Sequence, residues 1–208
     1  MTETMTEWTC TDLASALASK ESVPGGGAAA AYAGALAAAL GSMVANFTTG
    51  KKKYAAYEED IQRILEESIR ARIRLMELMD ADAACFYPLS QAYGIPKDDP
   101  TREETLEQCT KAALASPLAM MQETCSVIEL LEELEQKGSR LLLSDVGCGA
   151  ALARAALESA ALNVVVNTAG LKDRTFAAST DENCSRMLRE YCSRAQAIVD
   201  AVMASLRV

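Results

Sequence analysis

The sequence predicts an all-α protein, an antiparallel helical bundle of about five to six helices in a single domain spanning residues 1–208. Half of the residues are apolar but only 5% are aromatic, and the excess consists mostly of Ala, Leu and Met, which favour helices over strands. Long segments repeat apolar residues every three or four positions, and no alternating strand pattern of useful length is visible. A chain of this length can bury roughly 70% of its unfolded surface, enough for a real core.

The N-terminal part predicts a short helix followed by a sharp break. Thr9 or Thr11 can cap a helix that runs to about Lys20. The segment Ser22–Gly27 then contains Pro24 and three glycines, which interrupt regular structure.

A helix from about Gly27 to Phe47 follows, and it is predicted to be central because it is apolar on every side. The uncharged stretch 22–50 is also long enough to span a membrane. Its Ala and Gly content is only weakly apolar, and no second such segment follows. A buried helix with close backbone neighbours is therefore preferred, and no membrane partner is expected.

The remaining sequence predicts four more helical segments. From about Ala55, Ile61, Leu65, Ile69 and Ile73 follow the helical period, as far as a loop at 93–100 rich in Gly and Pro. Thr101 and Glu104 predict a capping box for the next helix, which runs to about Gly138 and is interrupted by Pro117. Two further helices are expected from Ser144–Asp145 to Thr168 and from about Thr180 to Leu206.

Composition excludes several classes of function. A net charge of -9 and a pI near 4.7 disfavour nucleic acid as a partner. The chain contains no His, which excludes His-based triads and imidazole general bases. Seven scattered cysteines without a C-x-x-C pair predict no metal site, and we read them as small buried residues in a reducing compartment. No secretory signal is visible at the N-terminus, so a cytoplasmic location is expected.

Two segments at opposite ends of the central helix have residue types suited to ligands. The turn Pro24-Gly25-Gly26-Gly27 leads into a helix N-terminus, whose free N–H groups suit an anion or a carbonyl, although such a run is more often only a turn. Asn46 and Lys51-Lys52-Lys53 lie at the other end. They are either a solvated basic end or the densest positive site available to a polyanionic ligand such as a glutamate tail.

Polar residues on otherwise apolar helix faces are further candidates. Asp80 falls within the apolar stripe of its helix and Asp82 at the edge, which predicts that one of them has a function. Ser144-Asp145 is most simply a helix cap. Asn163 and Asn167 share one face of an apolar helix, where their amides need buried backbone partners or a ligand.

These motifs, in this order and spacing, resemble the formiminotetrahydrofolate cyclodeaminase and methenyltetrahydrofolate cyclohydrolase family, over about residues 12–199. One departure is Ala28, where the family commonly has Ser after the glycines. The motifs that carry the resemblance are Ser22-Val23-Pro24-Gly25-Gly26-Gly27, Leu36 to Thr48, Lys51-Lys52-Lys53-Tyr54, Asp82 to Phe86, Ser144-Asp145-Val146-Gly147 and Asn163-Val164 to Asn167.

The resemblance implies a helical homodimer that binds a reduced folate with a polyglutamate tail and needs no cofactor beyond this tetrahydrofolate substrate. The first choice is a cyclodeaminase, which converts formiminotetrahydrofolate to methenyltetrahydrofolate and ammonia and would be linked functionally to a formiminotransferase. The alternative is a methenyltetrahydrofolate cyclohydrolase. A rival from another class is a non-catalytic folate-binding scaffold with the same shape.

Both chemistries pass through a tetrahedral carbon between nitrogens, which a carboxylate can stabilise while it moves protons. We therefore expect Asp82 and Asp145 to be an acid–base pair, with Lys53 as a third catalytic candidate. The residues expected to bind substrate are Pro24, Gly25, Gly26, Gly27, Asn46, Lys51, Lys52, Ser144, Asn163 and Asn167.

Overall fold

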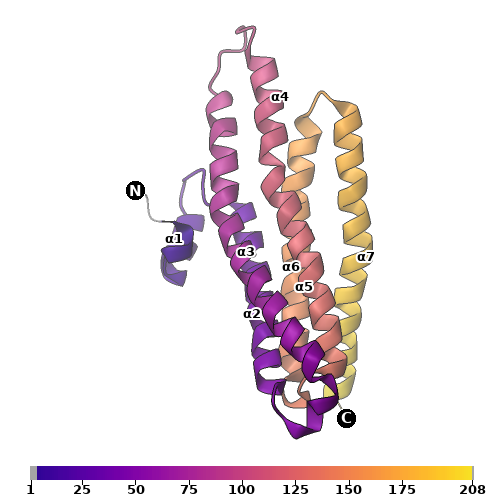
Figure 1. The fold of residues 1–208 in the computed structure, drawn as a ribbon. Helices are drawn as coiled ribbons and strands as arrows, with labels where there is room; N and C mark the ends of the chain where they lie inside the picture. Colours follow the sequence, from indigo (N-terminus) through magenta and orange to yellow (C-terminus); the bar gives the residue numbers. More distant parts are fainter. Residues whose placement is uncertain (1–3, 208) are drawn as a thin grey trace.

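The computed structural model describes residues 4–207, and this part of the chain forms helices and turns without a strand (Figure 1). The all-α antiparallel bundle predicted from the sequence is confirmed. Its α-helices are α1 (Cys10–Leu17), α2 (Gly26–Thr48), α3 (Glu58–Ala92), α4 (Arg102–Ala113), α5 (Ala115–Lys137), α6 (Leu143–Gly170) and α7 (Arg174–Leu206), with short 3-10 helices at Met5–Glu7, Lys52–Tyr57 and Arg140–Leu142.

Five long helices run side by side along the bundle, while α1 lies beside it near the N-terminus (Figure 1). Helix α2 packs against α3 and α6, and α7 packs on the far side of α6. Helix α5 contacts all four of these helices, so it covers one side of the layer that they form. The outer faces of α2 and α6 therefore point away from α5.

Small residues make α2 the central helix, as its composition predicts. Its buried positions are almost all Ala, Gly or Ser, and such residues let neighbouring helices approach closely. A Cβ atom on Gly34 would lie only 3.2 Å from a methyl group of Leu75 on α3. A larger side chain at this position would therefore push α3 away from α2.

Several predicted boundaries are confirmed. The Thr9 side chain accepts a hydrogen bond from the backbone N–H of Asp12 and caps α1, although α1 ends at Leu17 rather than Lys20. The expected interruption near Pro117 separates α4 from α5 at Leu114. Pro117 then occupies the first turn of α5, where a missing N–H costs no helical hydrogen bond.

Two predicted caps and one predicted helix start are wrong. Thr101 makes no side-chain cap, because its hydroxyl instead donates to Asp99 at 2.7 Å. Helix α6 begins one residue before Ser144, directly after a 3-10 turn, so Ser144-Asp145 lies within its first turn and not at the cap. The last helix begins at Arg174 and not near Thr180, since Asp173 accepts a hydrogen bond from the N–H of Phe176.

Two helical stretches, Gly26–Thr48 and Arg140–Gly170, are long and apolar enough to cross a membrane by length and composition. Only the first of them is expected from the sequence, and the expectation that no second such segment follows is wrong. Much of each stretch is buried by the other helices of the bundle, which agrees with core helices. Cysteine burial is mixed: Cys125 and Cys184 are buried as expected, whereas Cys10 and Cys148 are exposed.

Candidate active site

Three helices bring predicted site residues together at the N-terminal end of α2. The glycines of the 25–27 turn come from α2 and its cap, Asp82 comes from α3, and Asn163 comes from α6. With Ser22, Val23 and Phe86 they line a cavity of about 220 Å³. Residues separated by more than 130 positions in the sequence therefore share one site.

The absence of a side chain at Gly27 makes room for the Asp82 carboxyl group. A Cβ atom built on Gly27 would collide with all three atoms of that group. Gly26 is less constrained, because its Cβ atom would lie in ordinary contact with the Asn163 amide, 3.6 Å from Nδ2. The backbone of the first turn of α2 thus lies directly against the Asp82 carboxyl group.

The Asp82 carboxyl group is half-buried, and this burial raises its pKa from 3.8 to about 6. The positive end of the α2 dipole favours the ionised form and opposes part of this shift. Near neutral pH both protonation states are then accessible, which is the condition for a group that takes up and returns a proton. Among the residues lining the cavity, Asp82 alone has a titratable side chain.

Asn163 is held in place by its own helix. Its Nδ2 donates to the backbone carbonyl of Ser159 at 2.9 Å, which fixes the amide plane beside Gly26. The side-chain carbonyl is then available as an acceptor in the cavity. Asn167 lies one turn further along α6, and it does not line this cavity.

The other predicted residues lie at the opposite end of α2. Lys51, Lys52 and Lys53 are exposed after its C-terminus, and Lys53 Nζ lies 5.5 Å from the centre of the Tyr54 ring. The Tyr54 hydroxyl accepts a hydrogen bond from the N–H of Arg140, which lowers its pKa and ties this segment to the start of α6.

Asp145, in the first turn of α6, belongs to this basic end as well, together with exposed Ser144. Asp145 precedes Asn163 by 18 positions in one straight helix, a separation of roughly 27 Å at about 1.5 Å per residue. One chain therefore does not bring Asp82 and Asp145 together as the expected pair. Asn46 also lies at this end, exposed, with its Nδ2 donating to the carbonyl of Ser42.

Asp80 has a structural role that the sequence left open. Its Oδ1 accepts a hydrogen bond of 2.7 Å from the backbone N–H of Met5 and so fixes the N-terminal segment on α3. This segment encloses a second cavity of about 360 Å³, lined by Trp8, Val23, Pro24, Asp80, Ala83 and two N-terminal residues. Sequence reasoning missed Trp8, because a lone aromatic residue outside any motif is most simply part of the core.

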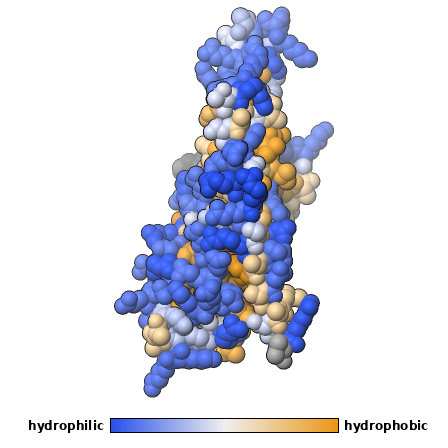
Figure 2. Space-filling model, turned by 90° about the vertical axis from the view of Figure 1, so that its right-hand side faces the viewer, coloured by the Kyte–Doolittle hydropathy of each residue, from blue (hydrophilic) through white to orange (hydrophobic). Residues whose placement is uncertain are grey.

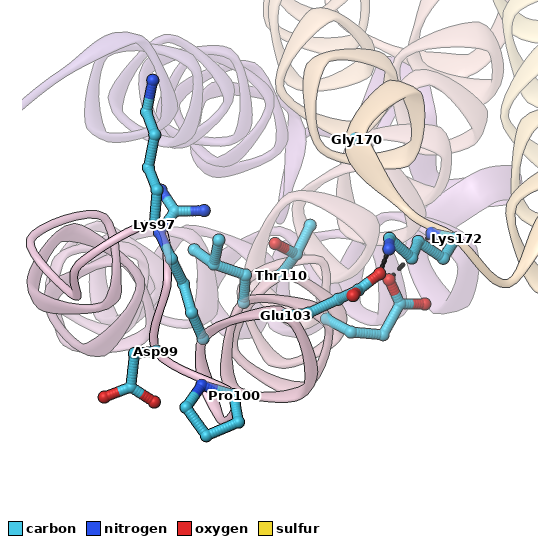
Figure 3. Close-up of a pocket in the computed structure, with 10 residues that line it drawn as sticks. Lys97, Asp99, Pro100, Glu103, Thr110, Gly170 and Lys172 are labelled. Carbon is cyan, nitrogen blue, oxygen red and sulfur yellow. Dashed lines mark hydrogen bonds and ion pairs between the residues drawn. The ribbon is translucent and has the colours of Figure 1, made fainter.

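A further cavity, of about 390 Å³, lies between α4 and the turn that joins α6 to α7 (Figure 3). Its charged groups neutralise one another. Lys172 and Glu103 form an ion pair and point toward each other in Figure 3, and the Glu107 carboxylate accepts the backbone N–H groups of Lys172 and Asp173. These contacts connect α4 to the turn, and we assign no ligand to this cavity.

Known proteins match almost the whole chain. The sequence profile of formiminotransferase-cyclodeaminase matches residues 9–186. The chain belongs to this family. A methenyltetrahydrofolate cyclohydrolase from Methylorubrum extorquens is 41% identical over 178 residues, which cover 84% of this chain and 86% of that protein.

Other members of the formiminotransferase-cyclodeaminase family agree with this match. The formimidoyltransferase-cyclodeaminase of Sus scrofa is 30% identical over 190 residues, 89% of this chain but only 35% of the larger pig protein. The crystal structure of a formiminotetrahydrofolate cyclodeaminase from Thermotoga maritima superposes with a TM-score of 0.84 at 28% identity, covering 95% of this chain and 98% of that one. The resemblance expected from the sequence is therefore confirmed.

Ala28 occupies the position at which the resemblance predicts Ser. Its methyl group is buried in the core, in the first turn of α2 directly after Gly27. This position thus offers no hydroxyl group to the site. The polar groups close to the cavity are the Asp82 carboxyl, the Asn163 amide, the Ser22 hydroxyl and the backbone N–H groups of the turn.

Proposed function

We propose that this protein acts on the one-carbon bridge between the N5 and N10 nitrogens of tetrahydrofolate, and that its reaction is the hydrolysis of methenyltetrahydrofolate. The observation that carries the proposal is the Asp82 carboxyl group, half-buried against the α2 N-terminus with a pKa raised to about 6. The 41% identity with a cyclohydrolase of similar length supports hydrolysis over the cyclodeamination that we placed first from the sequence alone.

The chemistry needs one proton carrier at the bridge. Water adds to the amidinium carbon, and ionised Asp82 accepts the proton that the water loses. The tetrahedral carbon then expels one nitrogen, which takes this proton from Asp82, and formyltetrahydrofolate is released with one proton lost overall to solvent. Asn163 and the N–H groups of the turn would hold the pterin ring and its carbonyl, which keeps the carbon near the water. A single carboxyl group suffices for this sequence, and we propose that no metal or redox cofactor takes part.

Cyclodeamination is the second candidate, because the Thermotoga maritima cyclodeaminase matches the whole fold. Here N10 attacks the carbon of the protonated formimino group, and the N10 proton moves to the departing amine, which leaves as ammonia while the methenyl product keeps the positive charge. The same carboxyl group can carry that proton. In this case a separate formiminotransferase activity would supply the substrate.

Near-ultraviolet absorbance of the methenyl group tests both reactions on the purified protein. Faster loss of methenyltetrahydrofolate, with no ammonia released from formiminotetrahydrofolate, supports hydrolysis. Chromophore formation with one ammonia per turnover supports cyclodeamination. No turnover with either compound, while a stable reduced folate still binds, would support the scaffold and reject both reactions.

We further propose that the protein is a homodimer. The outer sides of α2 and α6 form a face without charged residues on α2, which we call the α2–α6 face. Its exposed apolar residues include Ala29, Leu36, Phe47, Ala151, Ala155, Leu162, Val165 and Val166. The side of the bundle on which α7 lies is instead largely hydrophilic, with separate apolar patches (Figure 2). A largely apolar face of two long helices, interrupted on α6 by Glu158, is typical of an interface between identical chains.

A two-fold axis across this face would complete the site. If the axis is perpendicular to α2, the two copies of α2 pair antiparallel, so each N-terminal end meets the partner's C-terminal end. Asp82 of one chain would then face the basic end of the other, with Lys51–Lys53 and Asp145. This arrangement would explain why Asp82 and Asp145, the expected acid–base pair, lie far apart within one chain. It also places three lysines, on a chain with net charge -9, where a polyglutamate tail of the substrate can reach them.

A further inference from the structure

We infer that the N-terminal segment forms a second subsite, in which Trp8 packs against the aromatic ring of the substrate's aminobenzoyl group. The inference rests on the proposed folate function and assigns a role to the cavity of about 360 Å³ between this segment and α3. Trp8 is half-buried: part of its side chain packs against the core, and part lines the cavity.

The size of the Asp82 cavity is the first argument. At about 220 Å³ it is smaller than the roughly 300–1,000 Å³ of typical ligand pockets. This is about the room that one bicyclic ring needs, and a folate also has an aryl ring and a glutamate. The rest of the substrate must therefore occupy a neighbouring space.

Substrate geometry and continuity of the two cavities give the second argument. The aryl ring is bonded directly to N10, one of the two nitrogens that hold the reacting carbon, so it must lie next to Asp82. Val23 lines both cavities, and Pro24 and Ala83 continue the apolar wall from there to Trp8. An aromatic ring between Trp8 and this wall would gain stacking energy in addition to burial.

Charge limits which part of the substrate fits. Asp80 lines the cavity, with Oδ1 engaged by the N–H of Met5 at 2.7 Å, and its carboxylate repels the carboxylates of a glutamate. The neutral ring matches the subsite, whereas the tail must leave it. The Met5–Asp80 hydrogen bond also holds Trp8 in register with α3, so the subsite is already formed in the free protein.

Trp8 is the only tryptophan, which makes its fluorescence a specific probe of this subsite. We expect p-aminobenzoylglutamate, which lacks the pterin, to quench the emission saturably in the wild-type protein and equally in Asp82→Asn. Trp8→Ala should raise KM for methenyltetrahydrofolate about tenfold, as loss of roughly 1.4 kcal/mol of aromatic contact predicts, with kcat nearly unchanged. Trp8→Phe should restore most of the loss.

Two further variants separate this role from simple packing. Ala83→Leu fills the cavity without removing Trp8, and it should also raise KM and abolish quenching even if Trp8→Ala fails to fold. Tyr93→Ala removes an exposed aromatic side chain at the end of α3 and should leave KM unchanged. Saturable quenching of Trp8 fluorescence would support the subsite even if the protein shows no turnover. Absence of turnover would then reject only the proposed reaction. Unchanged KM in folded Trp8→Ala, or absence of quenching, overturns the inference.

Discussion

The backbone of Gly27 lies so close to the Asp82 carboxyl group that a single added carbon would collide with it. Two helices, α2 and α3, therefore meet at the one titratable group that lines the cavity. The backbone of this turn also shields the Asp82 carboxyl group from water, and this burial raises the pKa of Asp82. Gly27 therefore forms part of the turn and also leaves room for the carboxyl group that is proposed to transfer the proton.

Gly27→Ala should abolish turnover while the protein stays folded. The new methyl group displaces the carboxyl group, and a shift of about 1 Å at a reacting group can reduce the rate about 100-fold. Stability should not fall in proportion, since Ala favours a helix over Gly by up to about 1 kcal/mol. Steady-state kinetics and thermal unfolding measure the two effects.

Gly170→Ala is the matched control, because a Cβ atom there meets nothing within 4 Å. It makes the same chemical change in a helix away from the Asp82 cavity and should keep wild-type kinetics. Wild-type activity in Gly27→Ala would show that the position of Asp82 is not critical, and would remove the main support for its catalytic role.

The pH dependence of kcat/KM should reflect the pKa of Asp82. Hydrolysis needs the ionised carboxylate, so the rate should fall as the pH drops through about 6. Asp82→Asn should lose this dependence together with most of the activity, after subtraction of the uncatalysed rate. A profile with no inflection between pH 5 and pH 7 would assign the proton transfer to another group.

The same shift predicts how stability varies with pH. A folded-state pKa of about 6, above the ordinary 3.8, favours the protonated form in the folded protein. The contribution of protonated Asp82 to the free energy of unfolding is complete below about pH 4 and is lost as the pH rises through about 6. Relative to wild type, Asp82→Asn should therefore gain roughly 1–2 kcal/mol between pH 4 and pH 8, with allowance for solvent screening.

Asp99→Asn provides a control of opposite sign. Hydrogen bonds from Thr101 lower the pKa of Asp99, so its ionised form is the one favoured in the folded protein. This variant should lose stability relative to wild type as the pH rises from acid to neutral. Chemical unfolding at several pH values compares the two. Parallel curves for wild type and Asp82→Asn would contradict the raised pKa of Asp82.

The sequence was sufficient to predict the bundle but only half of the site. An uncharged apolar run located α2, helical periodicity located α3, and Asp82 stands out as a polar residue at the edge of the apolar stripe of α3. Which polar residues meet depends on the direction of each helix, and α6 runs antiparallel to α2. This topology brings Asn163 to Gly26 and carries Asp145 to the far end.

The other predictions were limited by local side-chain contacts, which the sequence pattern does not show. The sequence pattern did not distinguish Asp82 from Asp80, because only the folded chain shows that Asp80 accepts the N–H of Met5. Similarly, Asp173 caps α7, which begins six residues before the expected start, because a good cap precedes a stretch that has no apolar period of its own. Trp8 belongs to no motif, and its cavity exists only once the N-terminal segment folds onto α3.

A charge in the α2–α6 face should separate the proposed dimer. Leu162, 71% exposed in one chain, lies in this face, and Leu162→Glu would place a carboxylate in the apolar interface. We expect a folded monomer with little activity, detected by analytical ultracentrifugation. Met203→Glu changes an exposed side chain of α7 outside the α2–α6 face and should remain dimeric. A wild-type protein that sediments as a monomer would refute the dimer directly.

Mixing two inactive variants tests whether the site is shared. If Asp82 works with Asp145 of the partner chain, Asp82→Asn and Asp145→Asn are each inactive. A mixed dimer then has one intact site, and random reassociation of equal amounts should restore about a quarter of wild-type activity. No recovery, with exchange of subunits verified, would show that both residues act from the same chain. An Asp145→Asn variant that is active by itself would show that Asp145 is not involved.

The three lysines predict a preference for polyglutamylated substrate. Lys51, Lys52 and Lys53 are exposed, so their replacement by Ala should not affect folding, but should remove the attraction for the tail. We expect KM for a polyglutamylated folate to rise about tenfold and KM for the monoglutamate to change little, because exposed charges contribute up to about 1 kcal/mol each.

The wild-type preference for the polyglutamylated substrate should also weaken with salt, since screening shortens the reach of these charges to about 8 Å at physiological ionic strength. A variant with Lys20→Ala, Lys97→Ala and Lys172→Ala, three exposed lysines elsewhere on the surface, controls for the change in net charge. Equal KM ratios for the two substrates in wild type and triple variant would mean that the tail is bound elsewhere or left in solvent.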